Sequence, residues 1–433
     1  MKKRFGLLGE KLSHSYSPLI HGYLGEYEYP LYEVSPGGLD GFLRERSFDG
    51  INVTVPYKQA VAPYCASLAL EARLSGSVNT LIKDAQGELH GYNTDYHGFV
   101  SMLEAGGISA AGKKALILGD GGSAGTVRAA LAATGAREIV TVSRRAVTPG
   151  WAGYGQGIPG QARDDESVIY HEDNYGNTAR HFDAQIIINA TPVGMYPDTE
   201  ASPLPLTGFG QLGAVADLIY NPARTRLLLE AERLGIPCIN GLIMLAAQAE
   251  LASRLFTNGP ARPHLVEEIA AALRKKMLNI ALIGMPGCGK SAAGRALAQD
   301  LGRPLADTDE LIEAAAGKSI TQIFAEDGEA AFRELETRML AQEAKKSGLV
   351  IAAGGGVVTR PSNLDLLRQN SVIIYLRRAL GELAIEGRPL SQDMGIAALA
   401  QQRLPLYEAW SDHVVTVEAD VRRTVEKIQE AVQ

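Results

Sequence analysis

Short apolar runs recur along the chain and alternate with longer segments of helical periodicity. The runs at 115–118 and 280–283 each open onto a glycine-rich turn that is followed by an alanine-rich stretch. This pattern predicts a strand, a phosphate-binding loop and a helix. Further β-type runs at 139–142, 186–188 and 215–217 alternate with helical segments, such as 223–234. The middle of the chain is therefore predicted to form a doubly wound α/β sheet.

A division into two domains is predicted near residues 276–279. Two helical patterns, 244–256 and 264–276, precede the second phosphate-loop strand. The length of 433 residues exceeds what one compact core usually holds, and the hydrophobic fraction of 46% supplies two cores without a membrane-length run. The glycine-rich stretch at 149–166 is unusually long for a loop inside a compact domain, and no role is predicted for it.

Charge and cysteine content narrow the classes of function. The formal net charge of −7 argues against a nucleic-acid-binding surface. Any anionic substrate would therefore be bound by local basic residues. The three cysteines, Cys65, Cys238 and Cys288, lack metal-ligand spacing and indicate a reducing compartment. The start of the chain is more typical of a first strand than of a signal peptide. We expect a cytoplasmic protein with small-molecule partners, without nucleic acid or membrane, and either monomeric or homodimeric.

The first glycine-rich turn, 119–125, has the composition of a dinucleotide-binding loop. Missing side chains let backbone N–H groups and a helix N-terminus approach a pyrophosphate, although a tight strand-to-helix connection has the same composition. The next strand ends at Ser143-Arg144-Arg145, where NAD-binding sites usually have an acidic residue for the ribose 2′-hydroxyl. Arginine at this place favours the 2′-phosphate of NADP.

Polar clusters near the N-terminus supply candidate groups for the reduction of a ketone. Lys58 and Asp95 each lie just beyond a β-type segment. A lysine held beside an aspartate can give a proton to the developing alkoxide, while the carboxylate fixes its position. Taken singly, most such residues are solvated surface charges. The cluster at 14–18 offers two serine hydroxyls for a small carboxylate, or alternatively the N-cap of a helix that starts at Pro18.

Six segments together resemble shikimate dehydrogenase, in the order of that family and across nearly all of residues 1–275: 14–18, 52–58, 77–80, 93–95, 189–195 and 241–248. The resemblance implies a two-lobed enzyme that reduces 3-dehydroshikimate with NADPH. Its substrate lobe would comprise 1–103 and 240–276, and a Rossmann-type NADP-binding lobe would comprise 104–239. The family often has Asn-Arg-Thr where this chain has Ser143-Arg144-Arg145.

The resemblance also assigns roles to single residues. Lys58 and Asp95 would be the catalytic pair. The substrate would be bound by Ser15, Ser17, Thr54, Asn79, Asp95, Tyr220 and Gln248. NADP would be held by Gly119, Gly121, Gly122, Ser123, Ala124, Gly125, Ser143, Arg144 and Arg145.

The second glycine-rich turn, 284–291, matches the phosphate-loop pattern in full and directly follows a strand. In such a loop backbone amides wrap the β-phosphate of ATP, Lys290 offsets the charge that builds during transfer, and the Ser291 hydroxyl binds Mg²⁺. This motif is a strong signal. Cys288 inside the loop is expected to be a small filler.

Candidate groups for the phosphate acceptor lie further along the chain. Asp307 could organise the magnesium shell and Asp309 could accept a hydrogen bond from a substrate hydroxyl, although either could also cap the helix that follows. Arg333 and Arg403 lie in helical segments, where arginine is usually solvated. The glycines at 354–356 follow a strand and indicate a backbone pressed close to a ligand.

Residues 279 to about 430 resemble shikimate kinase in the order of these motifs. The resemblance implies a P-loop domain of the nucleoside-monophosphate-kinase type at 277–433 that forms shikimate 3-phosphate. Shikimate would be bound by Asp309, Arg333, Gly354, Gly355, Gly356 and Arg403, with the two arginines on its carboxylate. ATP would be bound by Gly284, Gly287, Cys288, Gly289, Lys290, Ser291, Ala292 and Arg388, with Lys290 catalytic, and Mg²⁺ by Ser291 and Asp307. The lid that would carry Arg388 is shorter than in many members, which have another arginine there.

The two resemblances imply consecutive reactions, because the product of the first is the substrate of the second. A regulator built from inactive enzyme domains is an alternative of another class, but Lys58, Asp95, Lys290 and Asp309 are all present. A quinate or NAD-linked dehydrogenase joined to the kinase is a nearer alternative. Arg144 and the two serines argue against it.

Overall fold

The computed structural model of the chain describes residues 3–12, 15–144, 168–383 and 395–432. The glycine-rich stretch at 149–166, Arg145 and Arg388 therefore lie outside the described residues. The chain divides into two compact units, the first made of 1–193, 202–220 and 230–271, and the second of 194–201, 221–229 and 272–433. No helix in the described part is long and apolar enough to cross a membrane.

The N-terminal sheet of the first unit is mixed. Its strand order is β2 (Leu31–Glu33), β1 (Leu7–Gly9), β3 (Gly50–Val53), β5 (Thr80–Lys83), β6 (Leu89–Tyr92) and β4 (Ser67–Leu68). β5 runs antiparallel to both β3 and β6, and a tight turn with Gly87 at φ +85° joins it to β6. β3 and β6 consequently run in the same direction, as does β1. All three strands end at one edge of the sheet.

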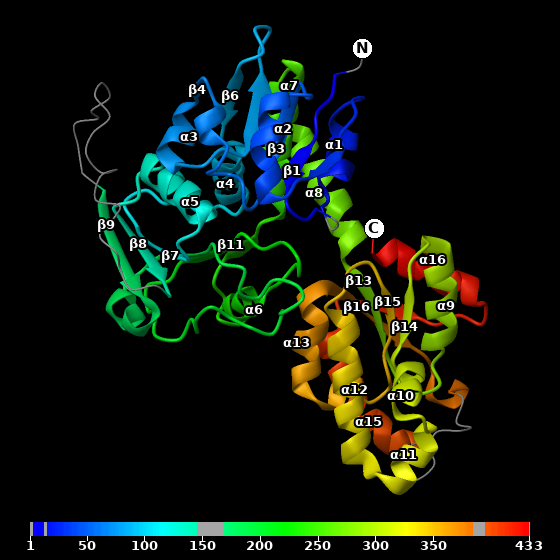
Figure 1. Ribbon diagram of the computed structural model, residues 1–433. Coiled ribbons are helices and arrows are strands. Elements are labelled where there is room, and N and C mark those ends of the chain that lie inside the picture. Colours follow the sequence, from blue (N-terminus) through cyan, green and yellow to red (C-terminus); the bar gives the residue numbers. More distant parts are fainter. Residues whose placement is uncertain (1–2, 13–14, 145–167, 384–394, 433) are drawn as a thin grey trace. The chain divides into compact units, whose positions relative to one another are not determined.

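Helices of the N-terminal lobe bury their apolar faces against this sheet or against one another. They are α1 (Ser17–Leu24), α2 (Leu39–Glu45), α3 (Leu70–Ser75), α4 (Thr94–Ala105) and α7 (Leu242–Thr257). The core combines Leu43 of α2 with Leu8, Ile51 and Leu81 of the strands. α7, from the distant end of this half of the sequence, packs on α4 and α1 (Figure 1). α7 confirms the helix predicted at 244–256 and begins two residues earlier.

The second sheet of the first unit is entirely parallel, as predicted. Its order is β12 (Cys238–Asn240), β11 (Ala214–Asp217), β10 (Ile186–Asn189), β7 (Lys114–Leu118), β8 (Glu138–Ser143) and β9 (Ile169–Asn174). The central strands are buried along their whole length, which explains their continuous apolar runs. β7 lies where the strand order reverses, so the turn before α5 (Gly122–Ala133) opens at a topological switch point.

One predicted helix of this region begins later than its sequence pattern suggests. The pattern extends over 223–234, whereas α6 spans Arg226–Arg233. The Thr225 hydroxyl accepts a hydrogen bond from the Leu228 N–H at 3.3 Å, which caps the first turn of the helix.

The second unit contains a five-stranded parallel sheet. Its order is β14 (Leu305–Asp307), β15 (Val350–Ala352), β13 (Asn279–Ile283), β16 (Ser371–Arg377) and β17 (His413–Thr416). The helices are α9 (Lys290–Leu301), α10 (Thr308–Ala316), α11 (Ile320–Glu326), α12 (Gly328–Ala344), α13 (Pro361–Asn370), α15 (Ile396–Trp410) and α16 (Val421–Ala431), preceded by α8 (Pro263–Met277).

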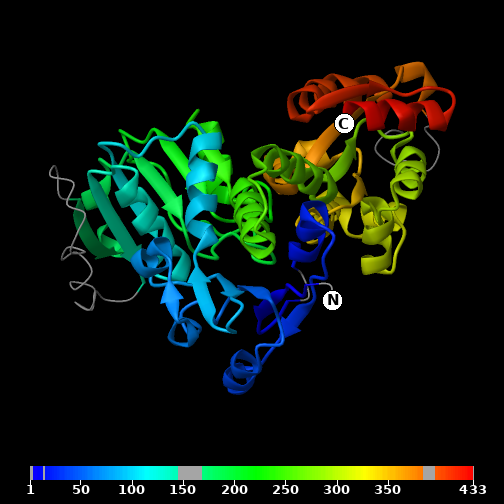
Figure 2. The same cartoon turned by 90° about the horizontal axis from the view of Figure 1, so that it is seen from above.

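Helices cover both faces of this sheet. α9 and α16 pack together on one face, and α13 packs on β16 and on α12 at the other face (Figure 1, and Figure 2 from above). β13 is the central strand and lies between β15 and β16. The glycine-rich turn after β13 therefore opens at the second switch point of the molecule, where ligands of open α/β sheets bind.

Candidate active sites

Lys58 and Asp95 form a close ion pair in the first unit. Lys58 follows β3 and Asp95 lies in the first turn of α4, which follows β6, so the common edge of the sheet brings them together. The Lys58 Nζ lies 2.6 Å from the Asp95 Oδ2, and the side chains are only 19% and 13% exposed. The Asn93 side chain caps α4 by accepting a hydrogen bond from the Tyr96 N–H. The pair is thus held in place by local structure.

A buried polar network surrounds the predicted substrate residue Asn79. Its Oδ1 accepts a hydrogen bond from the Thr94 N–H at 2.7 Å, and its Nδ2 donates to the Thr94 Oγ1 at 3.0 Å. The Thr94 hydroxyl also lies 3.4 Å from the Gln248 Oε1 of α7. The network therefore brings together two residues, Asn79 and Gln248, that are far apart in the sequence.

The predicted serines are linked to the same edge of the sheet by a residue that the sequence patterns did not indicate. The Tyr29 hydroxyl donates to the Asn52 Oδ1 at 2.6 Å, and the nearby Ser17 side chain opposes the rise in its pKa. Burial raises the pKa of Tyr29 well above its usual value, so the hydroxyl stays protonated. The Ser15 Oγ accepts a hydrogen bond from the Ser17 N–H at 3.2 Å. Nothing in the pattern around Tyr29 signals this contact, because it is purely tertiary.

The other two predicted substrate residues are partly exposed. Thr54 follows β3, and its backbone N–H donates to the Leu8 carbonyl. The ring of Tyr220, just beyond β11, lies 6.4 Å from the ring of Tyr16. Burial raises the pKa of Tyr220.

A cavity of about 560 Å³ opens at the glycine-rich turn after β7. It is lined by Gly119, Asp120, Gly121, Ser143, Arg144, Tyr175, Ala190, Thr191, Pro192, Val193, Ser202 and Pro203. Gly119 has φ +104°, and a Cβ there would lie 2.9 Å from the Thr191 side chain. The turn therefore requires glycine and leaves room for a ligand at the N-terminus of α5. Arg144 lines this cavity and places a guanidinium beside the glycine-rich turn.

The remaining predicted NADP residues stand in the first turn of α5 and do not line this cavity: Gly122, Ser123, Ala124 and Gly125. A Cβ on Gly125 would lie 2.8 Å from the Ser75 carbonyl oxygen, so this glycine serves close packing of α5 on α3. Asp120 and Tyr175 line the cavity without having been predicted. The Arg144 charge opposes the rise that burial gives to the pKa of Tyr175.

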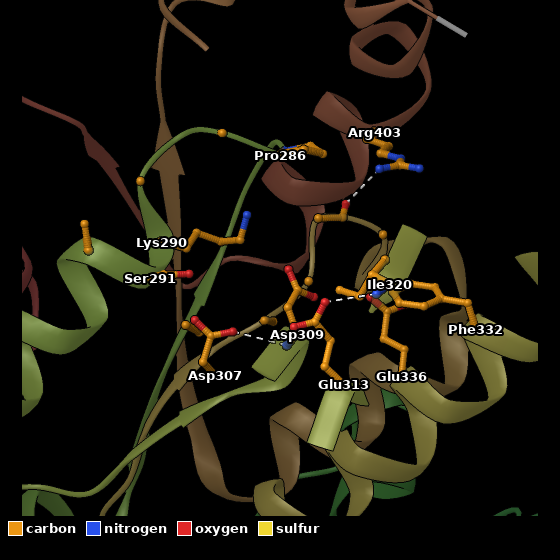
Figure 3. A pocket seen from close by; sticks show the side chains of 18 of the residues that line it. Pro286, Lys290, Ser291, Asp307, Asp309, Glu313, Ile320, Phe332, Glu336 and Arg403 are labelled. Carbon is orange, nitrogen blue, oxygen red and sulfur yellow. Dashed lines mark hydrogen bonds between the residues drawn. The ribbon is translucent and has the colours of Figure 1, made fainter. Parts of the chain in front are cut away.

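The phosphate loop of the second unit borders a cavity of about 600 Å³ (Figure 3). The predicted residues that line it are Gly287, Gly289, Lys290, Ser291, Ala292, Asp307, Asp309, Arg333, Gly354, Gly355, Gly356 and Arg403. Figure 3 shows Lys290, Ser291 and Asp309 around the same cavity. Lys290 is buried, and its Nζ donates to the carbonyls of Gly284 and Met285 at 2.9 and 3.1 Å.

Two predicted ATP residues of the loop, Gly284 and Cys288, do not line this cavity. Cys288 is fully buried in the core, as expected for a filler. Gly284 does not line the cavity, and a Cβ there would lie 2.6 Å from the Leu376 carbonyl oxygen. Its φ of +149° is also a conformation that side chains disfavour.

Ser291 and Asp307 both line the cavity and fit a magnesium ion. Asp307 also caps α10, because its Oδ1 accepts a hydrogen bond from the Asp309 N–H at 3.1 Å. No cluster of three or more histidine, cysteine, aspartate or glutamate side chains suited to a metal occurs among the described residues. One hydroxyl and one carboxylate agree with Mg²⁺, which keeps several waters and binds phosphate oxygens.

Buried arginines and carboxylates form the opposite wall. Arg333 donates to the Glu336 Oε2 at 2.7 Å and to the Glu329 Oε1 at 3.1 Å, and Arg403 donates to the Gly355 carbonyl at 3.2 Å. Glu336 is 1% exposed, and its other oxygen, Oε1, has no hydrogen-bond partner. Burial raises the pKa of Glu336, and the neighbouring Arg333 opposes this rise. The spacing of three residues from Arg333 on a helix could have indicated Glu336.

Side chains that line the cavity leave no room for a Cβ at Gly354, Gly355 or Gly356. A Cβ on Gly356 would lie 1.9 Å from the Arg333 guanidinium, and one on Gly354 would lie 2.4 Å from the Glu336 carboxylate. A Cβ on Gly355 would lie 2.7 Å from Pro286. The sequence predicted close approach to a ligand, whereas the structure shows close approach to side chains that line the cavity.

Comparison with known proteins gives two family matches. Residues 7–81 match the shikimate dehydrogenase substrate binding domain, and residues 286–433 match shikimate kinase. Shikimate dehydrogenase (NADP(+)) of Moorella thermoacetica is 36% identical over 274 residues, which cover 61% of this chain and 90% of the relative. The enzyme of Thermus thermophilus is 36% identical over 278 residues, 62% of this chain and 97% of the relative.

Solved structures resemble the same part of the chain. A chorismate mutase/shikimate 5-dehydrogenase fusion protein from Clostridium acetobutylicum has 31% identity and a TM-score of 0.55, with 64% of this chain and 98% of that chain covered. Shikimate 5-dehydrogenase from Thermus thermophilus in complex with NADP(H) and shikimate has 35% identity and a TM-score of 0.53, with 62% and 99% covered. This chain thus belongs to the shikimate dehydrogenase family, and it carries a shikimate kinase domain at residues 286–433.

Proposed function

We propose that the chain catalyses two consecutive steps of chorismate and aromatic amino-acid biosynthesis. The first reduces 3-dehydroshikimate to shikimate with NADPH, and the second transfers a phosphoryl group from ATP to shikimate. The observation that carries the proposal is the presence of the Lys58–Asp95 pair and of a cavity lined by the phosphate loop in one chain. We assign the reduction to residues 1–276 and the phosphorylation to residues 277–433.

In the reduction, bound NADPH supplies the hydride. Lys58 donates a proton from its Nζ to the ketone oxygen as the alkoxide develops, and Asp95 holds the ammonium group in position. The hydroxyls of Ser15 and Ser17 bind the substrate carboxylate, and the Tyr29 hydroxyl orients Ser17. Thr54, Asn79, Tyr220 and Gln248 complete the substrate site. The dense hydrogen bonding around Asn79 supports this assignment, because it fixes the polar groups before the substrate binds.

In the phosphorylation, bound MgATP supplies the phosphoryl group. Asp309 accepts the hydrogen bond of the substrate hydroxyl, and Lys290 offsets negative charge on the transferring group. Ser291 and Asp307 would hold the magnesium ion. Arg333 and Arg403 pair with the substrate carboxylate, with Gly354 to Gly356 forming the adjacent backbone. The burial of both arginines supports this role, because a desolvated guanidinium binds a carboxylate strongly.

Loss of Arg403 should weaken binding of shikimate much more than binding of ATP. Arg403→Ala is expected to raise KM for shikimate about tenfold to a hundredfold, because a hydrogen bond to a charged group contributes about 1.5–3 kcal/mol. Steady-state kinetics with each substrate varied in turn measure the two KM values. Arg422→Ala, at an exposed position of α16, is the matched control. Equal effects of Arg403→Ala on both KM values would place this arginine elsewhere than at the carboxylate.

Arg144 should decide the choice of cofactor. It can pair with the 2′-phosphate through charge-assisted hydrogen bonds, so NADPH is expected to be preferred over NADH about tenfold to a hundredfold. Arg144→Asp should invert the preference, because the carboxylate repels the phosphate and accepts a hydrogen bond from the free 2′-hydroxyl. The ratio of kcat/KM for the two cofactors measures this effect, with the exposed Arg137→Ala as control. A wild-type enzyme that used both cofactors equally well would refute the assignment.

Each reaction can be tested alone with the full chain. Oxidation of NADPH is followed by its absorbance in the presence of 3-dehydroshikimate, and ADP release is followed in the presence of shikimate and MgATP. Quinate with NAD is the competing substrate pair for the dehydrogenase half. Faster turnover of that pair would identify a quinate dehydrogenase instead.

A further inference from the structure

Arg378 is a basic residue of the kinase cavity for which the sequence patterns gave no role. It directly follows β16 and lines the cavity together with the phosphate loop. β16 pairs with β13, the strand that leads into this loop. At the end of β16 the Leu376 carbonyl lies against Gly284, the first residue of the loop. The backbone at Arg378 therefore follows directly on the segment that borders the phosphate loop.

The basic side chains that line the cavity differ in the hydrogen bonds that they donate to the protein. Within the described residues the cavity is lined by five basic side chains. Four of them donate hydrogen bonds to protein carbonyls or carboxylates, namely Lys290, Arg295, Arg333 and Arg403. Arg378 is the fifth.

Among the described residues, the Nε of Arg378 is an unused donor. Its Nε is buried and has no hydrogen-bond partner. The nearest carboxylate oxygen, on Glu382, lies 3.6 Å from this Nε, which is too long for a hydrogen bond. The Glu382 side chain is 63% exposed, against 30% for Arg378. An ion pair with such an exposed partner is weak, so it does not compete with a bound anion.

Two anionic groups enter this cavity if the proposed function holds, namely the carboxylate of shikimate and the phosphates of ATP. In the proposed function, Arg333 and Arg403 on the opposite wall bind the carboxylate. The phosphate loop has Lys290, whose Nζ is shared between two backbone carbonyls. A guanidinium is suited to bridge phosphate oxygens because its donors form a planar fork. We propose that Arg378 binds phosphate oxygens of ATP and is a further nucleotide-binding residue of the kinase site, an inference that rests on the proposed function.

The neighbouring arginine provides a matched control. Arg377 points to other partners, since it forms an ion pair with Glu408 at 3.0 Å and lies over the Tyr375 ring at 5.7 Å. It does not line the cavity. Arg377→Ala and Arg378→Ala therefore remove the same charge from adjacent positions, and only the second is expected to affect ATP.

The test measures KM for ATP, KM for shikimate and the calorimetric Kd of MgATP in the full chain. Arg378→Ala should raise KM and Kd for ATP about tenfold to a hundredfold and leave KM for shikimate unchanged. Arg378→Lys should recover part of the loss, because it restores the charge without the fork. Arg377→Ala should resemble the wild type in all three quantities.

The outcomes separate this inference from the proposed function. A wild-type chain that does not phosphorylate shikimate overturns the proposed function itself. If the wild type is active but Arg378→Ala and Arg377→Ala behave alike, the inference about Arg378 alone is wrong. A rise confined to KM for shikimate would assign Arg378 to the carboxylate and also overturn it. Should Arg378→Ala melt at a lower temperature than the wild type, Arg378→Gln, which retains the chain length, takes its place in the same comparison.

Discussion

Lys58→Ala is expected to lower kcat for the reduction by about two to four orders of magnitude, the range typical of general acid catalysis. The substitution removes the only described basic group that forms an ion pair with Asp95 and with it the proposed proton donor. Measurement of NADPH oxidation gives the loss directly. Phosphorylation of shikimate by the same preparation should persist, and a melting curve reports whether the first unit is folded.

A matched lysine in the same sheet controls for loss of charge. Lys83 of β5 donates to the Arg46 carbonyl at 2.8 Å and, among the described residues, forms no ion pair with Asp95. Lys83→Ala should therefore retain reduction at nearly the wild-type rate. A folded Lys58→Ala variant with normal reduction would show that another group supplies the proton.

Lys290→Ala is expected to lower kcat for phosphorylation by about two to three orders of magnitude, the usual loss when a preorganised electrostatic group is removed. Lys290 is buried at the phosphate loop, and water cannot readily replace its charge there. ADP release in the presence of shikimate measures the effect. Reduction of 3-dehydroshikimate by this variant should be unchanged.

The Nζ of Lys290 also holds two loop carbonyls, so stability has to be measured as well. A melting curve of the variant separates loss of chemistry from loss of fold. Lys427→Ala, which removes an exposed lysine paired with Glu418, is the control. A folded Lys290→Ala variant that lost both reactions would contradict the assignment of separate sites.

Elements with strong local signals were predicted well from the sequence. The strands β7 and β13 are continuous apolar runs that end in glycine-rich turns, and both the strands and the turns occur as predicted. The proximity of Lys58 and Asp95 was also expected, although the reason became clear only from the sheet. The antiparallel β5 makes β3 and β6 end at the same edge.

Contacts that depend on tertiary packing carried no such signal. Tyr29 reaches Asn52 across 23 residues of sequence, and Arg378 lines the kinase cavity only because β16 pairs with β13. The glycines at 354–356 were recognised as special, but their neighbours are Arg333, Glu336 and Pro286. Which side chains approach a glycine follows from the packing of distant segments, so the sequence pattern alone could not identify them.

The most direct test of the central claim supplies the purified full chain with 3-dehydroshikimate, NADPH and MgATP and identifies the products by mass spectrometry. The account predicts oxidation of NADPH together with formation of ADP and shikimate 3-phosphate. Omission of NADPH should abolish both products, because shikimate is then not formed, and omission of ATP should leave shikimate as the end product. Consumption of NADPH that ends at shikimate although ATP is present, or no consumption at all, would contradict the claim that one chain performs both steps.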